Sequence, residues 1–348
     1  MARRDRARRH TGLRYRLLVS AVSSPDRDEP RRQDDQRPSR KGGTDSLTVG
    51  FVGLGTMGRP MCLRLLDAGH RVVAHDIDPA AIEEVVSRGA EAAGSARHSA
   101  VECDILLTSL PAPRHVAAVM AGPDGALEAL RPGSVWVDFT TGSPELVREL
   151  AAAAPAGVAV VDCPVTGAVD GARRGTLTLF AGGDDEAVER VRPVLSHVGT
   201  ILECGPLGAG SVVKLVTNQL WFVNAAALGE SFAVGLANGV ELDTLWRAIL
   251  ASVGDSFVAR HDAPSIFAGH WDPSFPLDLC LKDLGLLADL EANVGADLPM
   301  TAAARSAFER AAARYGGAAG ELCVARRIAE DAALSMRLDG DWVPPWQA

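Results

Sequence analysis

The sequence lacks the features that mark several large classes of protein. It has no uninterrupted apolar run of about 18 residues, so we expect no membrane span. It has no G-x-S-x-G, the nucleophile elbow of many hydrolases. Its cysteines form neither C-x-x-C nor a zinc-spaced His/Cys cluster; they are Cys62, Cys103, Cys163, Cys204, Cys280 and Cys323. We therefore expect no bound metal, and thiols buried in a reducing cytoplasm.

Length and charge indicate an acidic protein with a basic start. A chain of 348 residues with 47% hydrophobic content can form two cores. Residues 1–46 hold 13 Lys and Arg against 7 Asp and Glu, and the remainder holds 22 against 37, a net charge of −15. We expect residues 1–46 to be a disordered basic extension. The acidic remainder argues against a nucleic-acid partner.

Three glycines at positions 53, 55 and 58 form the most informative motif, within residues 47–61. An apolar run at 49–52 predicts a strand, and apolar residues at helical spacing follow the glycines. Gly53 permits a tight turn, Gly55 lets a pyrophosphate approach the backbone, and Gly58 lets the helix pack on the strand. The free N–H groups at the helix start favour phosphates. This stretch predicts a dinucleotide site.

Asp76 ends the second predicted strand, about 20 residues beyond the glycines. A carboxylate there binds a ribose 2′-hydroxyl and repels a 2′-phosphate, and residues 77–79 offer no arginine for such a phosphate. The pattern favours NAD, with NADP as the alternative. A turn at 76–79 would explain the same aspartate without any ligand.

Strands at 104–111, 135–139 and 158–161 alternate with helices, which is typical of a parallel sheet covered on both faces. Ligands bind such sheets at the carboxyl ends of the strands. The glycine-rich stretch at 162–177 is either an anion-binding loop or a plain connection to a strand at 177–181.

From Gly208 the apolar period becomes helical and continues for about 30 residues to an Asn-Gly cap. Lys214 and Asn218 lie four apart in this helix, so they share a face. A lysine among valines and leucines must be solvated, paired or used in chemistry, and snorkelling to solvent is the simplest alternative. Further helices are expected at 242–253, 278–293, 299–314 and 320–336. Lys282 and Asp283 could be an ordinary surface ion pair.

These patterns predict an N-terminal Rossmann-type doubly wound sheet, followed by an all-α domain with a long interdomain helix. We place the NAD-binding domain at 47–209, the helical substrate and dimerisation domain at 210–337, and a loosely attached tail at 338–348.

Four stretches together resemble the β-hydroxyacid dehydrogenase family, over about residues 47–335. Residues 51–61 fit its G-L-G-x-M-G-x-x-M signature, and residues 162–177 resemble its substrate loop D-x-P-V-S-G-G-x-x-G-A-x-x-G-T-L. Residues 208–218 resemble its catalytic segment, and residues 282–284 its K-D-L element. The resemblance implies an NAD(P)-dependent oxidoreductase that interconverts a small β-hydroxy acid and its semialdehyde or keto form.

The resemblance also implies roles for individual residues. Lys214 corresponds to the catalytic lysine, the general acid and base. Substrate contacts are implied for Thr166, Gly167, Ala168, Asn218, Phe275 and Asp283. Cofactor contacts are implied for Gly53, Leu54, Gly55, Thr56, Met57, Gly58, Asp76, Leu110, Pro111, Thr141 and Lys282. Thr166 replaces the usual serine and Ala168 the usual glycine, which narrows the loop by a methyl group. A homodimer or homotetramer is expected.

Two other functions stay open at this point. An imine reductase-like NADPH enzyme would share the fold and the glycine signature, but such enzymes usually lack the lysine at 214. A non-catalytic NAD-binding protein on the same scaffold would be expected to lose either the lysine or the substrate loop, and this sequence keeps both.

Overall fold

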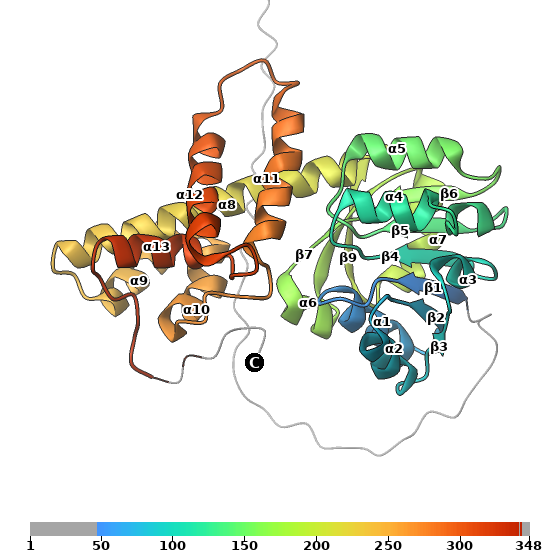
Figure 1. Ribbon diagram of the computed structural model, residues 1–348, viewed down its shortest axis with the longest axis horizontal. Helices are drawn as coiled ribbons and strands as arrows, with labels where there is room; N and C mark the ends of the chain where they lie inside the picture. Colours follow the sequence, from blue (N-terminus) through green and yellow to red (C-terminus); the bar gives the residue numbers. More distant parts are fainter. Residues whose placement is uncertain (1–46, 341, 343–348) are drawn as a thin grey trace, which may run out of the picture. The chain divides into compact units, whose positions relative to one another are not determined.

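The computed structural model describes residues 47–340 and 342, and the expected basic extension at 1–46 lies outside them. The described residues form a Rossmann-type sheet domain followed by a helical domain, which confirms the predicted fold class (Figure 1). The chain passes from the sheet to the helices at the start of the long helix α8 (Ala209–Ala237).

The sheet is mixed, with its larger part parallel. Its strands are β1 (Thr48–Val52), β2 (Arg71–His75), β3 (Glu91–Ala92), β4 (Ile105–Thr108), β5 (Val135–Asp138), β6 (Ala159–Asp162), β7 (Val165–Thr166), β8 (Leu177–Gly182) and β9 (Gly199–Gly205). The order β3-β2-β1-β4-β5-β6 is parallel throughout, as in dinucleotide-binding sheets. β8 then runs antiparallel to β6 and β7 and parallel to β9. The sequence predicted a strand at β8 but not its reversal.

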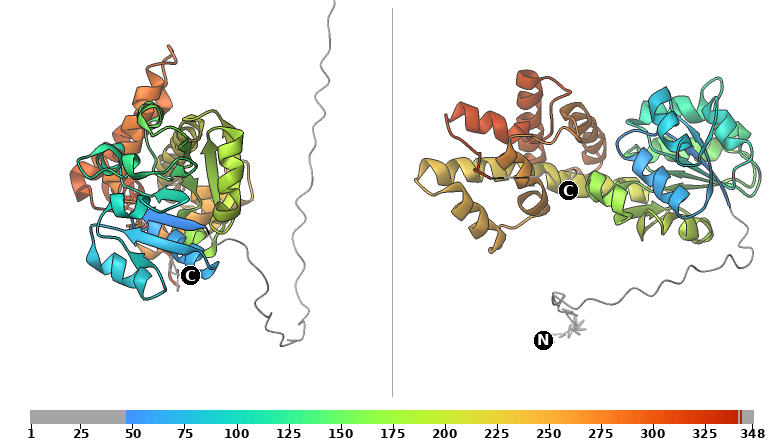
Figure 2. Two further views of the ribbon diagram at one scale, coloured as in Figure 1. Left: turned by 90° about the vertical axis from the view of Figure 1, so that its right-hand side faces the viewer. Right: turned by 90° about the horizontal axis from the view of Figure 1, so that it is seen from below.

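Helices cover both faces of the sheet (Figures 1 and 2). They are α1 (Gly58–Asp67), α2 (Pro79–Val86), α3 (Ala96–Ala100), α4 (Pro113–Ala121), the 3-10 turn η1 (Leu127–Ala129), α5 (Pro144–Ala153), α6 (Ala168–Arg174) and α7 (Asp185–Leu195). Phe51 and Leu107 pack under α1 and α2, whereas Leu106 and Trp136 pack under α3 and α4. Because neighbouring strand residues face opposite layers, the strands are apolar at nearly every position.

The helical domain forms a second core around α8. Its other helices are α9 (Leu242–Leu250), the π-helical η2 (Val258–Asp262), α10 (Ala263–Ala268), α11 (Leu277–Glu291), α12 (Pro299–Tyr315) and α13 (Cys323–Asp331). Phe222 and Phe232 of α8 are buried against these helices. By length and composition α8 could cross a membrane, with a mean hydropathy of 1.4, but a core helix passes the same test. We therefore interpret α8 as the spine of this domain.

Three predictions need correction or addition. The glycine-rich stretch 162–177 forms β7 and the short helix α6, which ends at Gly175 in the left-handed region (φ +68°). The helix expected at 320–336 is shorter, because α13 spans only Cys323–Asp331. The tail at 338–348 was expected to be loosely attached, but its residue Trp342 packs edge-on against Trp246 and Phe267. The ring centroids are 5.4 and 5.1 Å apart.

Candidate active site

The glycine turn between β1 and α1 has the tight geometry that the motif predicts. Gly53 has a φ of +96°, where a side chain would be strained. A Cβ on Gly58 would stand 1.9 Å from the Gly53 carbonyl oxygen, so α1 can approach the turn only without one. A Cβ on Gly55 would meet no protein atom within 4 Å. Packing therefore does not require glycine at 55, whereas close approach of a pyrophosphate does.

Asp76 lies beside this turn. One carboxylate oxygen accepts a hydrogen bond from the Leu54 backbone N–H at 2.5 Å, and the other accepts one from the Asp78 N–H at 2.8 Å. Asp78, not Asp76, caps α2 through the Ala80 N–H. Ile77, the next residue, is 96% exposed. Asp76 is thus held at the glycine turn by two backbone hydrogen bonds.

A buried polar network stabilises the carboxyl ends of β4 and β5. Asp138 accepts hydrogen bonds from the Thr108 hydroxyl at 2.8 Å and the Thr140 N–H at 3.0 Å. The Thr140 hydroxyl in turn accepts one from the Leu110 N–H at 3.1 Å. Burial raises the pKa of Asp138 to about 6. This network holds residues 110–111 and Thr141 at the edge where the cofactor was expected.

Asp162, at the end of β6, fixes the start of α8. Its two carboxylate oxygens accept hydrogen bonds from the Gly208 and Ser211 N–H groups, both at 2.6 Å. A carboxylate in this position satisfies N–H groups that have no partner within the helix and complements the helix dipole. A Cβ on Gly210 would stand 2.1 Å from the Phe180 carbonyl oxygen, so α8 approaches the sheet closely. Asp162 therefore sets the position of Lys214, which follows Ser211 by three residues.

Lys214 lies in a partly buried position that alters its chemistry. Burial lowers the pKa of its ammonium group to about 8, and the nearby charge of Lys282 acts in the same direction. The carboxylates of Asp283 and Glu321 oppose this shift. A primary amine with this pKa can give or take a proton near neutral pH. The structure does not support the simple snorkelling interpretation.

Residues from three elements meet beside Lys214. The Asn218 side-chain amide donates to Asp283 at 2.7 Å, and the Lys282 ammonium lies 2.6 Å from the other oxygen of that carboxylate. Lys282 also donates to the Thr141 carbonyl oxygen at 2.9 Å, which joins α11 to the loop after β5. Asp283 is only 2% exposed, so Lys282 and Asp283 are not a surface ion pair.

The remaining substrate candidates are Thr166, Gly167 and Ala168, where β7 passes into α6, and Phe275, just before α11. Thr166 ends β7, Gly167 has a φ of +124°, and Ala168 keeps a left-handed φ of +57° although it is not glycine. Such a backbone is strained and marks a constrained loop. The Phe275 ring packs edge-on against Trp221 of α8, with centroids 6.2 Å apart.

Sequence reasoning missed a group of buried acids beside the lysine. Asp262, Asp272 and Glu321 place carboxylate oxygens within 4.8 Å of one another. Burial raises the pKa of Glu321 well above its usual range, and its side chain is hydrogen-bonded to Asp272. Such a pair shares protons, so the cluster is better suited to hold protons than a cation. The three acids come from segments that are distant in sequence, so no local spacing predicts that they meet.

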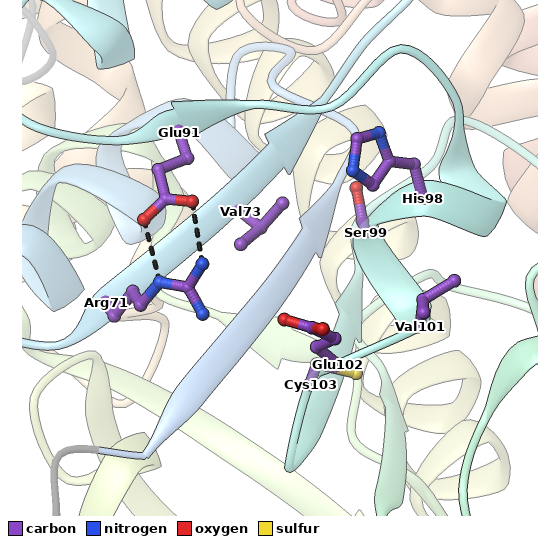
Figure 3. Close-up of a pocket in the computed structure, with 8 residues that line it drawn as sticks. All are labelled: Arg71, Val73, Glu91, His98, Ser99, Val101, Glu102 and Cys103. Carbon is purple, nitrogen blue, oxygen red and sulfur yellow. Dashed lines mark hydrogen bonds and ion pairs between the residues drawn. The ribbon is translucent and has the colours of Figure 1, made fainter.

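A cavity of about 200 Å³ lies away from this site (Figure 3). Arg71 and Glu91, the first residues of β2 and β3, line it and form a two-pronged ion pair at 2.7 and 2.8 Å. It therefore lies at the amino ends of the strands, whereas the glycine turn and Thr141 lie at their carboxyl ends. We do not assign it to the cofactor or the substrate.

Comparison with known proteins identifies the class to which this arrangement belongs. Residues 48–208 match the NAD binding domain of 6-phosphogluconate dehydrogenase. Residues 208–328 match the NAD-binding domain of NADP-dependent 3-hydroxyisobutyrate dehydrogenase. The two matches meet at the start of α8. The protein is an NAD(P)-binding oxidoreductase.

Individual relatives narrow this class. The chain is 39% identical to 2-(hydroxymethyl)glutarate dehydrogenase of Eubacterium barkeri, over 76% of this chain and 89% of that protein. It is 35% identical to the NAD-dependent L-serine dehydrogenase of Pseudomonas aeruginosa, over 75% and 90%. The Mycobacterium tuberculosis 3-hydroxyisobutyrate dehydrogenase structure with L-serine superimposes with a TM-score of 0.74 at 31% identity, covering 81% of this chain and 99% of that one. The chain belongs to the β-hydroxyacid dehydrogenase family.

Proposed function

We propose that this protein is an NAD-dependent dehydrogenase of a small β-hydroxy acid, with Lys214 as the general acid and base. The observation that carries the proposal is the amine of Lys214, with a pKa lowered to about 8, beside the hydrogen-bonded group of Asn218, Asp283 and Lys282. Membership of the family makes hydroxy acids the substrate class. The particular acid is left to the assay below.

Lys214 would perform the proton transfer of the reaction. In oxidation its neutral amine takes the proton of the substrate hydroxyl, and in reduction its ammonium returns a proton to the carbonyl oxygen. A bound nicotinamide would accept the hydride from the carbon that bears this hydroxyl, or supply a hydride to that carbon in reduction. Asp283 adds negative charge near the amine, which opposes the lowering of its pKa by burial.

Asn218 and the loop around Gly167 would orient the substrate. Because one N–H of the Asn218 amide is bound to Asp283, the amide orientation is fixed and its other N–H can donate to a substrate oxygen. We assign the substrate carboxylate to Thr166, Gly167 and Ala168, as the family resemblance implies. Phe275 would close the apolar side of the site, and the turn residues Leu54, Thr56 and Met57 would line the cofactor.

Asp76 supports NAD over NADP. Its carboxylate lies at the glycine turn, and a 2′-phosphate there would face a negative charge with the apolar Ile77 as its next neighbour. NADP stays the second choice until binding is measured.

An assay of a substrate panel with two lysine variants tests the proposal. The panel contains 3-hydroxyisobutyrate, glycerate, 4-hydroxybutyrate and L-serine, each with NAD and NADP. Lys214→Ala removes the base, and Lys214→Arg keeps the charge but cannot release a proton near neutral pH. Both variants should lose at least about 100-fold in kcat while NAD binding changes little. Near wild-type turnover by either variant would refute the role of Lys214.

Two other assay results would favour the alternatives. No observation favours an imine reductase or a silent NAD-binding protein, and Lys214 with its lowered pKa argues against both. Reduction of a cyclic imine with NADPH, without turnover of any acid on the panel, would favour the first. NAD binding without turnover of any substrate would favour the second.

We also propose a homodimer or homotetramer, and a domain boundary near residue 209. Exposed apolar side chains on α8 support self-association: Val216, Leu220 and Val234 are 45, 62 and 65% exposed. Light scattering would give the assembly mass, and Leu220→Asp with Val234→Asp should reduce it. Six free thiols among the described cysteines are consistent with the proposed cytoplasmic location.

A further inference from the structure

His261 connects the two domains beside the substrate loop. It lies in η2 of the helical domain, and its Nε2 is 3.3 Å from an Asp170 carboxylate oxygen. Asp170 is a buried residue of α6, the helix that begins at Ala168 directly after Gly167. The other ring nitrogen, Nδ1, is 2.7 Å from an oxygen of Asp262. His261 therefore bridges two buried carboxylates, one from each domain.

The bridge continues to the catalytic helix. The second oxygen of Asp262 accepts a hydrogen bond from the Trp221 indole N–H at 2.9 Å. Trp221 lies seven residues after Lys214 on α8, so both side chains project from the same side of the helix. The Phe257 ring stacks on the imidazole, with centroids 4.5 Å apart and planes 23° apart. Asp170, His261, Asp262 and Trp221 thus join the helix of the substrate loop to the helix of Lys214.

The charges around His261 favour its protonated form. Burial opposes the imidazolium charge, but Asp262 and Asp170 outweigh it and raise the pKa of His261 above its ordinary value. Arg174 of α6 is paired with the other carboxylate oxygen of Asp170. Asp272 and Glu321 lie behind Asp262, and burial raises the pKa of both. As an imidazolium, His261 can donate one N–H to each carboxylate, whereas a neutral ring can donate only one.

We propose that His261 is a positioning residue, whose imidazolium holds α6 and the loop Thr166–Ala168 against the helical domain in the geometry that binds the substrate carboxylate. This inference rests on the proposed function, and it adds a role for protonation at a second group besides Lys214. Because the protonated ring holds α6 against the helical domain, the effect is present below the ordinary histidine pKa. It is lost as pH rises through the raised pKa of His261.

The first test examines the contacts of His261 by a measurement that does not depend on enzyme activity. The ring signal of His261 is identified in the NMR spectrum of the full chain by its loss in His261→Gln, with exposed His98→Gln as the matched control. We expect His261 to titrate above the ordinary value of about 6.5, and Asp170→Asn to lower that pKa. A titration at or below about 6.5, or no response to Asp170→Asn, would overturn the proposal.

The second test measures its consequence for the substrate. His261→Gln and Asp170→Asn should each raise KM for the hydroxy acid about tenfold while kcat and NAD affinity change less than about threefold. In the wild type KM should rise with pH through the His261 titration, and in His261→Gln this rise should disappear. A KM profile shared by wild type and His261→Gln would refute the positioning role. Absence of turnover by the wild type would refute the proposed function instead, and the NMR test would still decide whether the bridge exists.

Discussion

Replacement of Asp162 by asparagine should weaken both stability and catalysis, because this carboxylate holds the start of α8. Both of its oxygens accept backbone N–H groups at 2.6 Å, but an amide offers only one oxygen. Its NH₂ group would then face a second N–H donor. Loss of one hydrogen bond to a charged group costs about 1.5–3 kcal/mol, and loss of the helix-dipole interaction costs about 0.3–1 kcal/mol.

We expect the destabilisation of Asp162→Asn to lie near the lower end of these costs. Burial raises the pKa of Asp162, so its ionised form carries a desolvation cost that the neutral amide avoids. We expect a loss of about 2 kcal/mol in the free energy of unfolding, seen as a melting temperature lower by about 4–8 °C. Lys214 lies in the first turns of α8, so a loosened helix start would displace its amine. We therefore expect kcat to fall about 10- to 100-fold.

Asp138→Asn is the matched control. Asp138 is the register partner of Asp162 in the neighbouring strand and is also buried. One of its partners, the Thr108 hydroxyl, can rotate to suit an amide, so we expect a loss below about 1 kcal/mol. Thermal unfolding and steady-state kinetics of both variants check the comparison. Equal melting temperatures for the two variants, or an unchanged kcat in Asp162→Asn, would refute the reasoning.

The remaining predictions concern the cofactor. Asp76→Ala with Ile77→Arg should shift preference toward NADP, because it removes the repelling carboxylate and adds a cation for the 2′-phosphate; unchanged kcat/KM ratios for the two cofactors would show that the ribose lies elsewhere. Gly55→Ala should weaken NAD binding without lowering the melting temperature, since a Cβ there meets no protein atom within 4 Å. Gly58→Ala should instead destabilise the fold by about 1–3 kcal/mol, because its Cβ would overlap the Gly53 carbonyl. Calorimetry and thermal unfolding separate the two glycines, and the reverse order of effects would contradict the assignment.

The sequence predicted the features that depend on local patterns. The glycine turn, the long helix and the strands expected at 104–111 and 135–139 are each encoded in one continuous segment. All four are present, but the first strand is shorter than expected and spans only Ile105–Thr108. Helical spacing alone places Lys214 and Asn218 on one face of α8, whereas the pattern by itself suggested only a surface ion pair for Lys282 and Asp283. The family resemblance then supplied roles that spacing could not give.

Features made by distant segments were not predictable in this way. Asp262, Asp272 and Glu321 meet because the backbone N–H of Glu321, just before α13, bonds to the carbonyl oxygens of Asp272 and Phe275. Trp271 and Asp272 adopt left-handed φ values of +59° and +46° there. The link from His261 to Asp170 spans 91 residues of sequence. α6 was missed because Gly171 and Gly175, poor helix formers, made its segment look like a loop.

The most direct test of the central claim is the pH dependence of kcat for oxidation of the best hydroxy acid on the panel. If Lys214 is the base, kcat rises with pH as its amine loses a proton, with a midpoint at or below about 8, and reduction shows the opposite trend. Lys214→Ala should lose this dependence together with most of its rate. A wild-type kcat that stays flat from about pH 6 to about pH 10 would contradict the account.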